Sequence, residues 1–175
     1  MARLTPPRPK HSAPRRLILS DTSPLLGLSR VDGIPWLADL FGEVWITTEV
    51  SQELLATSAI EQPIRQALDA GWLQLLDPPN DLPPCPPHLG PGEWSTIQGA
   101  LAHDGPCLLL MDDRTARREA QSMGLAVTGT AAVIGMAQKR GVIPSARDVF
   151  EQLLQSDFRI APKILREILL ELEEK

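Results

Sequence analysis

Short apolar runs alternate with segments of helical periodicity along almost the whole chain. Strand-like runs lie at 17–20, 44–47, 72–76 and 107–111, and a shorter one lies at 125–129. Between them, apolar residues recur every three or four positions, which is typical of amphipathic helices. This alternation predicts an α/β fold, a three-layer sandwich whose mostly parallel central sheet has helices on both faces.

Prolines and glycines mark where several of the expected helices begin and end. Gly42 and Gly141 are expected to end helices, whereas Pro144 and Pro162 are expected to start them. The stretch 77–91 contains seven prolines and is therefore expected to be a loop. The C-terminal helix carries an apolar stripe, which indicates core packing, with a dimer or partner surface as the alternative.

Length and composition indicate a single globular domain. The chain has 175 residues, of which 43 % are hydrophobic and 22 % charged. No apolar stretch approaches the ~20 residues of a membrane helix, and the N-terminus has no signal-peptide pattern, so no membrane partner is expected. Cys85 and Cys107 have no metal-ligand spacing, which predicts reduced thiols in a cytoplasmic protein.

Charge separates an N-terminal arm from the rest of the chain. Residues 1–16 contain five of the 17 basic residues and none of the 22 acidic ones, so the remainder has a net charge of −10. This predicts a basic, proline-rich, disordered arm over 1–16 and one folded domain over 17–175. The arm would contact a polyanion or, alternatively, only keep the protein in solution. The acidic remainder argues against broad duplex binding, which needs many basic contacts.

Five acidic residues lie where short apolar runs stop. Asp21 follows the first run, and the pair Asp112 and Asp113 follows the fourth. Ligands of parallel sheets bind outside the carboxyl ends of the strands, so these residues should share one edge of the sheet. Glu53 comes shortly after the second run, and Glu93 opens a helical pattern after the proline-rich loop.

Carboxylates that gather in this way need a compensating charge. Like charges a few ångströms apart raise one another's pKa and oppose folding. Hard cations such as Mg²⁺ or Mn²⁺ take carboxylate oxygens as ligands and leave positions open for phosphate. Metal-dependent cleavage of a phosphodiester is therefore the first hypothesis.

Each acid also has a structural interpretation that involves no ligand. Asp21 would cap a helix, Glu53 would be a solvated helix residue, and Glu93 would complement the dipole of a helix N-terminus. One of Asp112 and Asp113 would cap the next helix.

Other charged side chains allow similar alternatives. Arg114, Arg117 and Arg118 follow the acid pair on one helical face, where they would bind RNA phosphates or, alternatively, form a solvated face with local salt bridges. Glu49 is interpreted as surface charge.

The ordered set of segments is similar to a known family. The run DTSPLLGLSRVDGIPWLADLFGEVWITTEVSQEL resembles the opening of PIN-domain nucleases, and within them a VapC-like branch. GEWSTIQGA, LLLMDDRTARREA, LAVTGTAAVIGMAQKRGVIPS and DFRIAPKILREILLEL follow in the order that this resemblance requires. It extends over about residues 17–172.

The resemblance implies a PIN-like three-layer nuclease domain and a Mg²⁺- or Mn²⁺-dependent ribonuclease, often the toxin of a toxin–antitoxin pair. The partners that it implies are an RNA substrate and an antitoxin protein. The alternative interpretation of the apolar C-terminal stripe adds a second copy of the chain in a homodimer. The expected catalytic residues are Asp21, Glu53, Glu93 and Asp112. The expected metal ligands are Asp21, Glu93, Asp112 and Asp113, with Thr128 and Thr130 as auxiliary residues.

Three positions depart from the family pattern. Trp94 and Gly99 lie where relatives usually carry small helix formers, and Thr48 lies where many have proline. None of the three is one of the acids.

Two other functions compete with the nuclease. A receiver-like phospho-acceptor domain also gathers strand-end acids around Mg²⁺, but it would have its acid pair after the first strand and a lysine after a later one. A catalytically inert PIN-like module would bind RNA or a protein without needing every carboxylate, so metal binding separates it from the nuclease.

Overall fold

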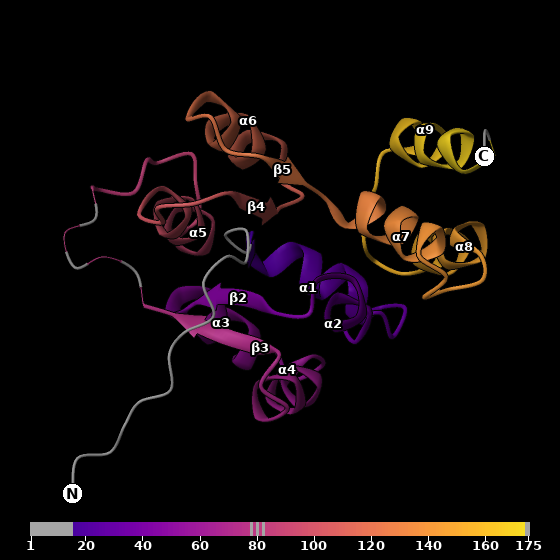
Figure 1. Cartoon of the computed structure of the whole chain (residues 1–175), viewed down its shortest axis with the longest axis horizontal. Helices are drawn as coiled ribbons and strands as arrows, with labels where there is room; N and C mark the ends of the chain where they lie inside the picture. The colour runs from indigo at the N-terminus through magenta and orange to yellow at the C-terminus, as the bar shows by residue number, and fades with distance from the viewer. Residues whose placement is uncertain (1–15, 78, 80, 82, 174–175) are drawn as a thin grey trace, which may run out of the picture.

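A parallel five-stranded sheet runs through the described part of the molecule (Figure 1). The computed structural model describes residues 16–77, 79, 81 and 83–173. The strand order across the sheet is β3-β2-β1-β4-β5. The strands are β1 (Leu17–Ser20), β2 (Val44–Thr47), β3 (Leu73–Leu76), β4 (Cys107–Leu110) and β5 (Val127–Thr128).

Helices cover both faces of this sheet, which confirms the three-layer α/β sandwich. In Figure 1, α5 and α6 lie on one side of the sheet, and α1, α2 and α7 lie on the other. The helices of the described residues are α1 (Thr22–Ser29), α2 (Trp36–Phe41), α3 (Thr48–Leu55), α4 (Glu61–Asp69), α5 (Pro91–Leu101), α6 (Arg114–Ser122), α7 (Thr130–Lys139), α8 (Ala146–Gln155) and α9 (Pro162–Glu173).

Successive residues of the central strands face two different hydrophobic cores. Ile18 and Leu110 belong to the larger core, which includes residues from α1, α2, α3, α4, α7, α8 and α9. Leu19 and Leu109 belong to a smaller core against α5 and α6. Side chains alternate along a strand, so a sheet covered on both faces needs apolar residues at every position. That requirement explains the continuous apolar runs in the sequence.

Most of the expected helix boundaries agree with the structure. Gly42 and Gly141 follow α2 and α7 with φ of 75° and 71°, a conformation that favours glycine over residues with a Cβ. Pro144 does not start α8. The N-cap is Ser145, whose Oγ accepts a hydrogen bond from the Asp148 amide at 3.2 Å. Of the predicted basic arm, only Arg16 lies within the described residues.

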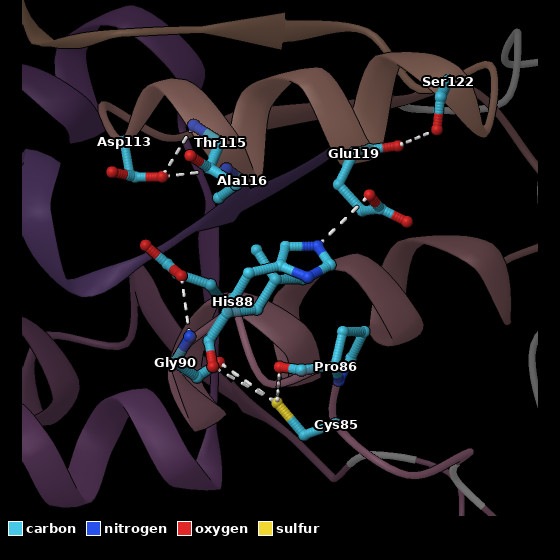
Figure 2. Close-up of polar contacts among 11 residues, drawn as sticks. Cys85, Pro86, His88, Gly90, Asp113, Thr115, Ala116, Glu119 and Ser122 are labelled. Carbon is cyan, nitrogen blue, oxygen red and sulfur yellow. Dashed lines mark hydrogen bonds and ion pairs between the residues drawn. The ribbon is translucent and has the colours of Figure 1, made fainter.

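The proline-rich segment contains no strand and no helix among its described residues before α5 begins. It is held to the domain by side-chain contacts, some of which Figure 2 shows. Trp94 Nε1 donates to the Pro83 carbonyl at 2.9 Å, and His88 Nε2 lies 3.5 Å from a Glu119 carboxylate oxygen on α6. Trp94, one of the departures from the family pattern, therefore anchors this segment.

None of the helices in the described ranges combines the length and the apolar character needed to cross a membrane.

Candidate active site

The strand order creates a switch point between β1 and β4. The chain runs outward from β1 through β2 to β3, then returns to place β4 on the other side of β1. Connections that leave neighbouring strands in opposite directions open a crevice at the carboxyl edge of a parallel sheet. Ser20 pairs with Leu110 in the register, and the Asp21 amide donates to the Leu110 carbonyl at 2.9 Å. The two strand-end acidic segments are therefore neighbours, as predicted.

Three of the predicted acids line one cavity of about 290 Å³, which we call the acid cavity. Asp21 comes from the end of β1, Glu53 from α3 and Glu93 from the first turn of α5. The Asp21 side chain is almost fully buried, with 2 % of the residue exposed. The other described residues of the lining are Thr22, Ser23, Gly90 and Gly92.

Glu53 is exposed, yet it is fixed by two other elements. Its carboxylate accepts hydrogen bonds from the Thr22 hydroxyl at the start of α1 and from the Gly92 amide in α5, the latter at 3.2 Å. The interpretation of Glu53 as a solvated helix residue is therefore incomplete, because its exposed carboxylate is also bound by two other elements.

Glu93 combines the two interpretations that its sequence position allowed. Its Oε2 accepts from the Gly90 amide at 2.8 Å, which satisfies a free N–H before α5. The same side chain lines the acid cavity. Burial raises the pKa of Glu93, the Gly90 hydrogen bond opposes that change, and the charges of Asp113 and Glu53 add to it.

Asp21 carries the largest electrostatic penalty in the acid cavity. Burial raises its pKa to about 7, and the charges of Glu93 and Glu53 contribute in the same direction. The amides of Thr22 and Ser23 favour the charged form, although Asp21 makes no capping hydrogen bond with its side chain. Asp21 occupies the N-cap position of α1, but helix capping does not account for its burial beside two other carboxylates.

Asp112 is directed away from the acid cavity. Its two oxygens accept from the Thr130 amide at 2.8 Å and from the Thr130 hydroxyl at 2.6 Å, at the start of α7. Burial raises the pKa of Asp112, while the Thr130 hydrogen bonds and the charge of Arg117 oppose the rise. Asp112 lines a different cavity, of about 530 Å³, together with Thr128. The structure thus divides the predicted acids between two neighbouring cavities.

Asp113 is the cap of α6, one of the two roles foreseen for this pair. Its Oδ1 accepts from the amides of Thr115 and Ala116 at 2.8 and 2.9 Å, as Figure 2 shows. Its charge also raises the pKa of Glu93, although Asp113 itself does not line the acid cavity. Its role as a metal ligand stays a prediction.

The fit to a metal ion depends on how many protein ligands the ion needs. Within the residues that the structure describes, no three Asp, Glu, His or Cys side chains form a group ready to hold a metal. Mg²⁺, however, usually keeps several waters and binds one or two carboxylates together with substrate phosphate. The carboxylates of Asp21, Glu53 and Glu93 around one cavity fit this smaller requirement.

Two features, one in the first turn of α3 and one in the acid cavity, were not found from the sequence. Glu49 was interpreted as surface charge, but its Oε2 is buried and has no hydrogen-bond partner among the described residues. Gly92 gives Glu53 its room, because a Cβ at Gly92 would lie 2.8 and 2.9 Å from the two carboxylate oxygens. The sequence marks Gly92 only by its residue type, because glycine is a poor helix former and yet lies in the first turn of a helix.

Comparison with known proteins identifies the fold family. The model of the family DUF3368, described as a PIN domain, matches residues 17–174. The chain belongs to this PIN-domain family. The match confirms the resemblance to PIN domains. PIN domains are in general nucleases and typically use divalent metals.

A solved structure supports the same assignment of this PIN domain at the level of the fold. A PilT N-terminus domain protein from the hyperthermophilic archaeon Sulfolobus solfataricus P2 is similar, with a TM-score of 0.50 and 17 % sequence identity. The alignment covers 83 % of this chain and 99 % of the archaeal chain. Among curated proteins, none matches.

The contact between Thr130 and Asp112 leads to a stability prediction for this PIN domain. Thr130→Val keeps the side-chain shape but removes the hydroxyl donor, so the half-buried Asp112 carboxylate loses a hydrogen bond worth about 1.5–3 kcal/mol. The loss should be largest above the pKa of Asp112, because only the charged form requires the donor. Urea unfolding at pH 4 and pH 8 measures the difference, with Thr128→Val as the control. A penalty that is independent of pH, or shared by the control, would contradict this role.

Proposed function

We propose that this PIN domain is a divalent-metal-dependent ribonuclease that hydrolyses RNA phosphodiester bonds, and that it is the toxin of a toxin–antitoxin pair. The observation that carries the proposal is the acid cavity at the switch point. Three carboxylates from three separate elements line it, and none of its described lining residues is basic. A fold that raises the pKa of a buried aspartate to about 7 without pairing it is typical of a functional site.

Asp21 and Glu93 are the residues that would hold the cation, with Asp113 as a further predicted ligand, whereas Asp112 is bonded to Thr130 and lines the other cavity. A divalent cation bound there would stabilise negative charge on phosphate oxygens and make a water molecule more acidic. Within the chain itself, Thr22 and Gly92 hold the Glu53 carboxylate in place. Glu53 is thereby oriented to accept a proton from the attacking water.

Cleavage of a panel of single-stranded and structured RNAs tests the enzyme. The wild-type protein should cut with Mg²⁺ or Mn²⁺ and stop when the metal is chelated. Titration with Mn²⁺ alone distinguishes the ribonuclease from the alternative, a catalytically inert PIN-like module. No cutting and no metal binding would favour that module.

The toxin role has its own test. Induced expression of the wild-type chain in a bacterial host should arrest growth, and expression of Asp21→Asn should not. Equal growth of both cultures, with both proteins present at the same level, would contradict the toxin role. It would not contradict the ribonuclease. A copurifying antitoxin would be an additional partner of the wild-type protein.

Gly92 offers a further test of the acid cavity. Gly92→Ala places a methyl group against the Glu53 carboxylate and forces it to move. We expect cleavage to fall about tenfold or more, a loss of at least about 1.4 kcal/mol in transition-state stabilisation. The fold should remain, because alanine is the better helix former.

Gly99→Ala is the matched control, since its Cβ also meets a side chain closely, Leu76 at 2.9 Å, but in the part of α5 beyond the acid cavity. Equal activity of the two variants would contradict the positioning of Glu53.

A further inference from the structure

The second cavity, of about 530 Å³, differs from the acid cavity in its charge. We call it the arginine cavity because Arg114, Arg117 and Arg159 line it. Arg114 and Arg117 come from α6, whereas Arg159 comes from the segment before α9, more than 40 residues later in the chain. The fold therefore concentrates positive charge at this place although the chain as a whole is acidic.

Two of the charges in the arginine cavity are already matched within the protein. Arg117 donates to the Met111 carbonyl at 3.0 Å, and its charge acts on Asp112. Glu167 has a cation of its own, since Lys163 Nζ lies 3.8 Å from it. Within the described ranges, Arg114 and Arg159 make no hydrogen bond and no ion pair through their side chains, and both residues are exposed. These two guanidinium groups are available to an anion.

Helix ends add to the positive potential. The lining includes residues at the N-terminal ends of three helices: Arg114 in α6, Ala131 in α7, and Ala161 directly before α9. A helix N-terminus carries partial positive charge and favours phosphate. Asp113 and Asp112 accept hydrogen bonds from backbone amides at the N-terminal ends of α6 and α7, respectively. The first turn of α9 contains no acidic residue.

The remaining wall of the arginine cavity is aliphatic. Ala131, Ala132, Ile160 and Ile164 contribute to it, and none of its described lining residues is aromatic. A cavity of this volume has the size of a small-molecule site and would admit one nucleotide rather than a paired duplex. The arginine cavity has no aromatic surface on which a base could stack, and its charged residues would contact phosphate. It would therefore discriminate weakly between bases.

We propose that the arginine cavity binds one nucleotide of a single-stranded RNA, with Arg114 and Arg159 on its phosphate, beside the phosphate that is cut. The proposal rests on the proposed ribonuclease. The two cavities lie at the ends of neighbouring strands, because Asp21 of the acid cavity follows β1, Asp112 of the arginine cavity follows β4, and the Asp21 amide donates to the Leu110 carbonyl at 2.9 Å. One strand can therefore occupy both.

Binding without cleavage tests this site. Fluorescence anisotropy would measure the affinity of a labelled single-stranded RNA for the whole chain in the presence of a chelator. Arg159→Ala and Arg114→Ala should each weaken binding about tenfold, and each should lower the slope of log affinity against log salt by about 0.7. Arg65→Ala is the control, because Arg65 is paired with Glu61 on α4 and lies outside the cavity.

Four results would overturn the proposal. They are wild-type affinity in both arginine variants, an equal loss in Arg65→Ala, equal binding of duplex RNA, and displacement of the RNA by polyglutamate at equal charge concentration. The last would point to an acidic protein segment as the ligand.

Cleavage assays on the same variants keep the two proposals apart. If the arginine variants lose RNA binding but the wild type never cuts, only the ribonuclease fails. If the wild type cuts and the arginine variants bind normally, only the arginine cavity fails.

Discussion

Asp21→Asn is expected to abolish RNA cleavage, by about a thousandfold or more, while the fold remains intact. The residue lies at the switch point of the sheet, is 2 % exposed and is the innermost carboxylate of the acid cavity. Asparagine keeps its shape but removes the negative charge that a cation would need. A thousandfold loss corresponds to about 4 kcal/mol of transition-state stabilisation.

Asp69→Asn provides the comparison for this experiment. Asp69 is an exposed residue at the end of α4, so the same chemical change there should leave cleavage at the wild-type level. Single-turnover cleavage with Mg²⁺ or Mn²⁺ measures both variants, and circular dichroism verifies the fold. Cutting by Asp21→Asn at the wild-type rate would show that the acid cavity is not the active site.

The same substitution is expected to stabilise the metal-free protein at pH 8, by an amount on the order of 2–4 kcal/mol. The pKa of Asp21 rises from 3.8 to about 7 on folding, so the folded state holds this proton more tightly than the unfolded state. The penalty for charging Asp21 is therefore absent below about pH 4, grows between pH 4 and 7, and is complete above pH 7. Asparagine mimics the protonated form and avoids the penalty throughout.

Urea unfolding in the presence of a chelator, at several pH values from 4 to 8, measures this effect. The stability of Asp21→Asn relative to the wild type should rise with pH, whereas Asp69→Asn should show no such trend. Added Mn²⁺ should reverse the order at pH 8, because the cation stabilises only the protein that retains the carboxylate. A stability difference that does not change between pH 4 and 8 would mean that Asp21 is not held at a raised pKa.

Much of the fold was predictable from the sequence, because a sheet covered on both faces leaves a strong signal. The apolar runs that contain Leu19 and Leu109 are strands, as expected, and their neighbours Ile18 and Leu110 face the opposite core. The position of Asp21 and Asp112 at one edge also followed, since it requires only that both follow parallel strands. These features depend on local pattern and on the general geometry of parallel sheets.

The direction of individual side chains was not predictable in the same way. Asp112 faces Thr130 and not Asp21 because α7 presents an amide and a hydroxyl at that point, and the sequence does not encode that approach locally. The burial of one Glu49 carboxylate oxygen was likewise not predictable from the local pattern. Arg159 joins Arg114 only because the chain folds back before α9. Such contacts between distant segments require a three-dimensional structure.

The way the proline-rich segment joins α5 determines where this protein would tolerate extra residues. The segment is anchored at Pro83 through Trp94 and at His88 through Glu119, and it ends at the first turn of α5, which holds Glu93 and supports Glu53. A loop pays little entropy for added length, so an inserted tag directly after Asp77 would be accommodated. The same tag between His88 and Gly92 would displace two carboxylates at once. The segment is therefore suited to attachment of a tag at its beginning, whereas its end is part of the acid cavity.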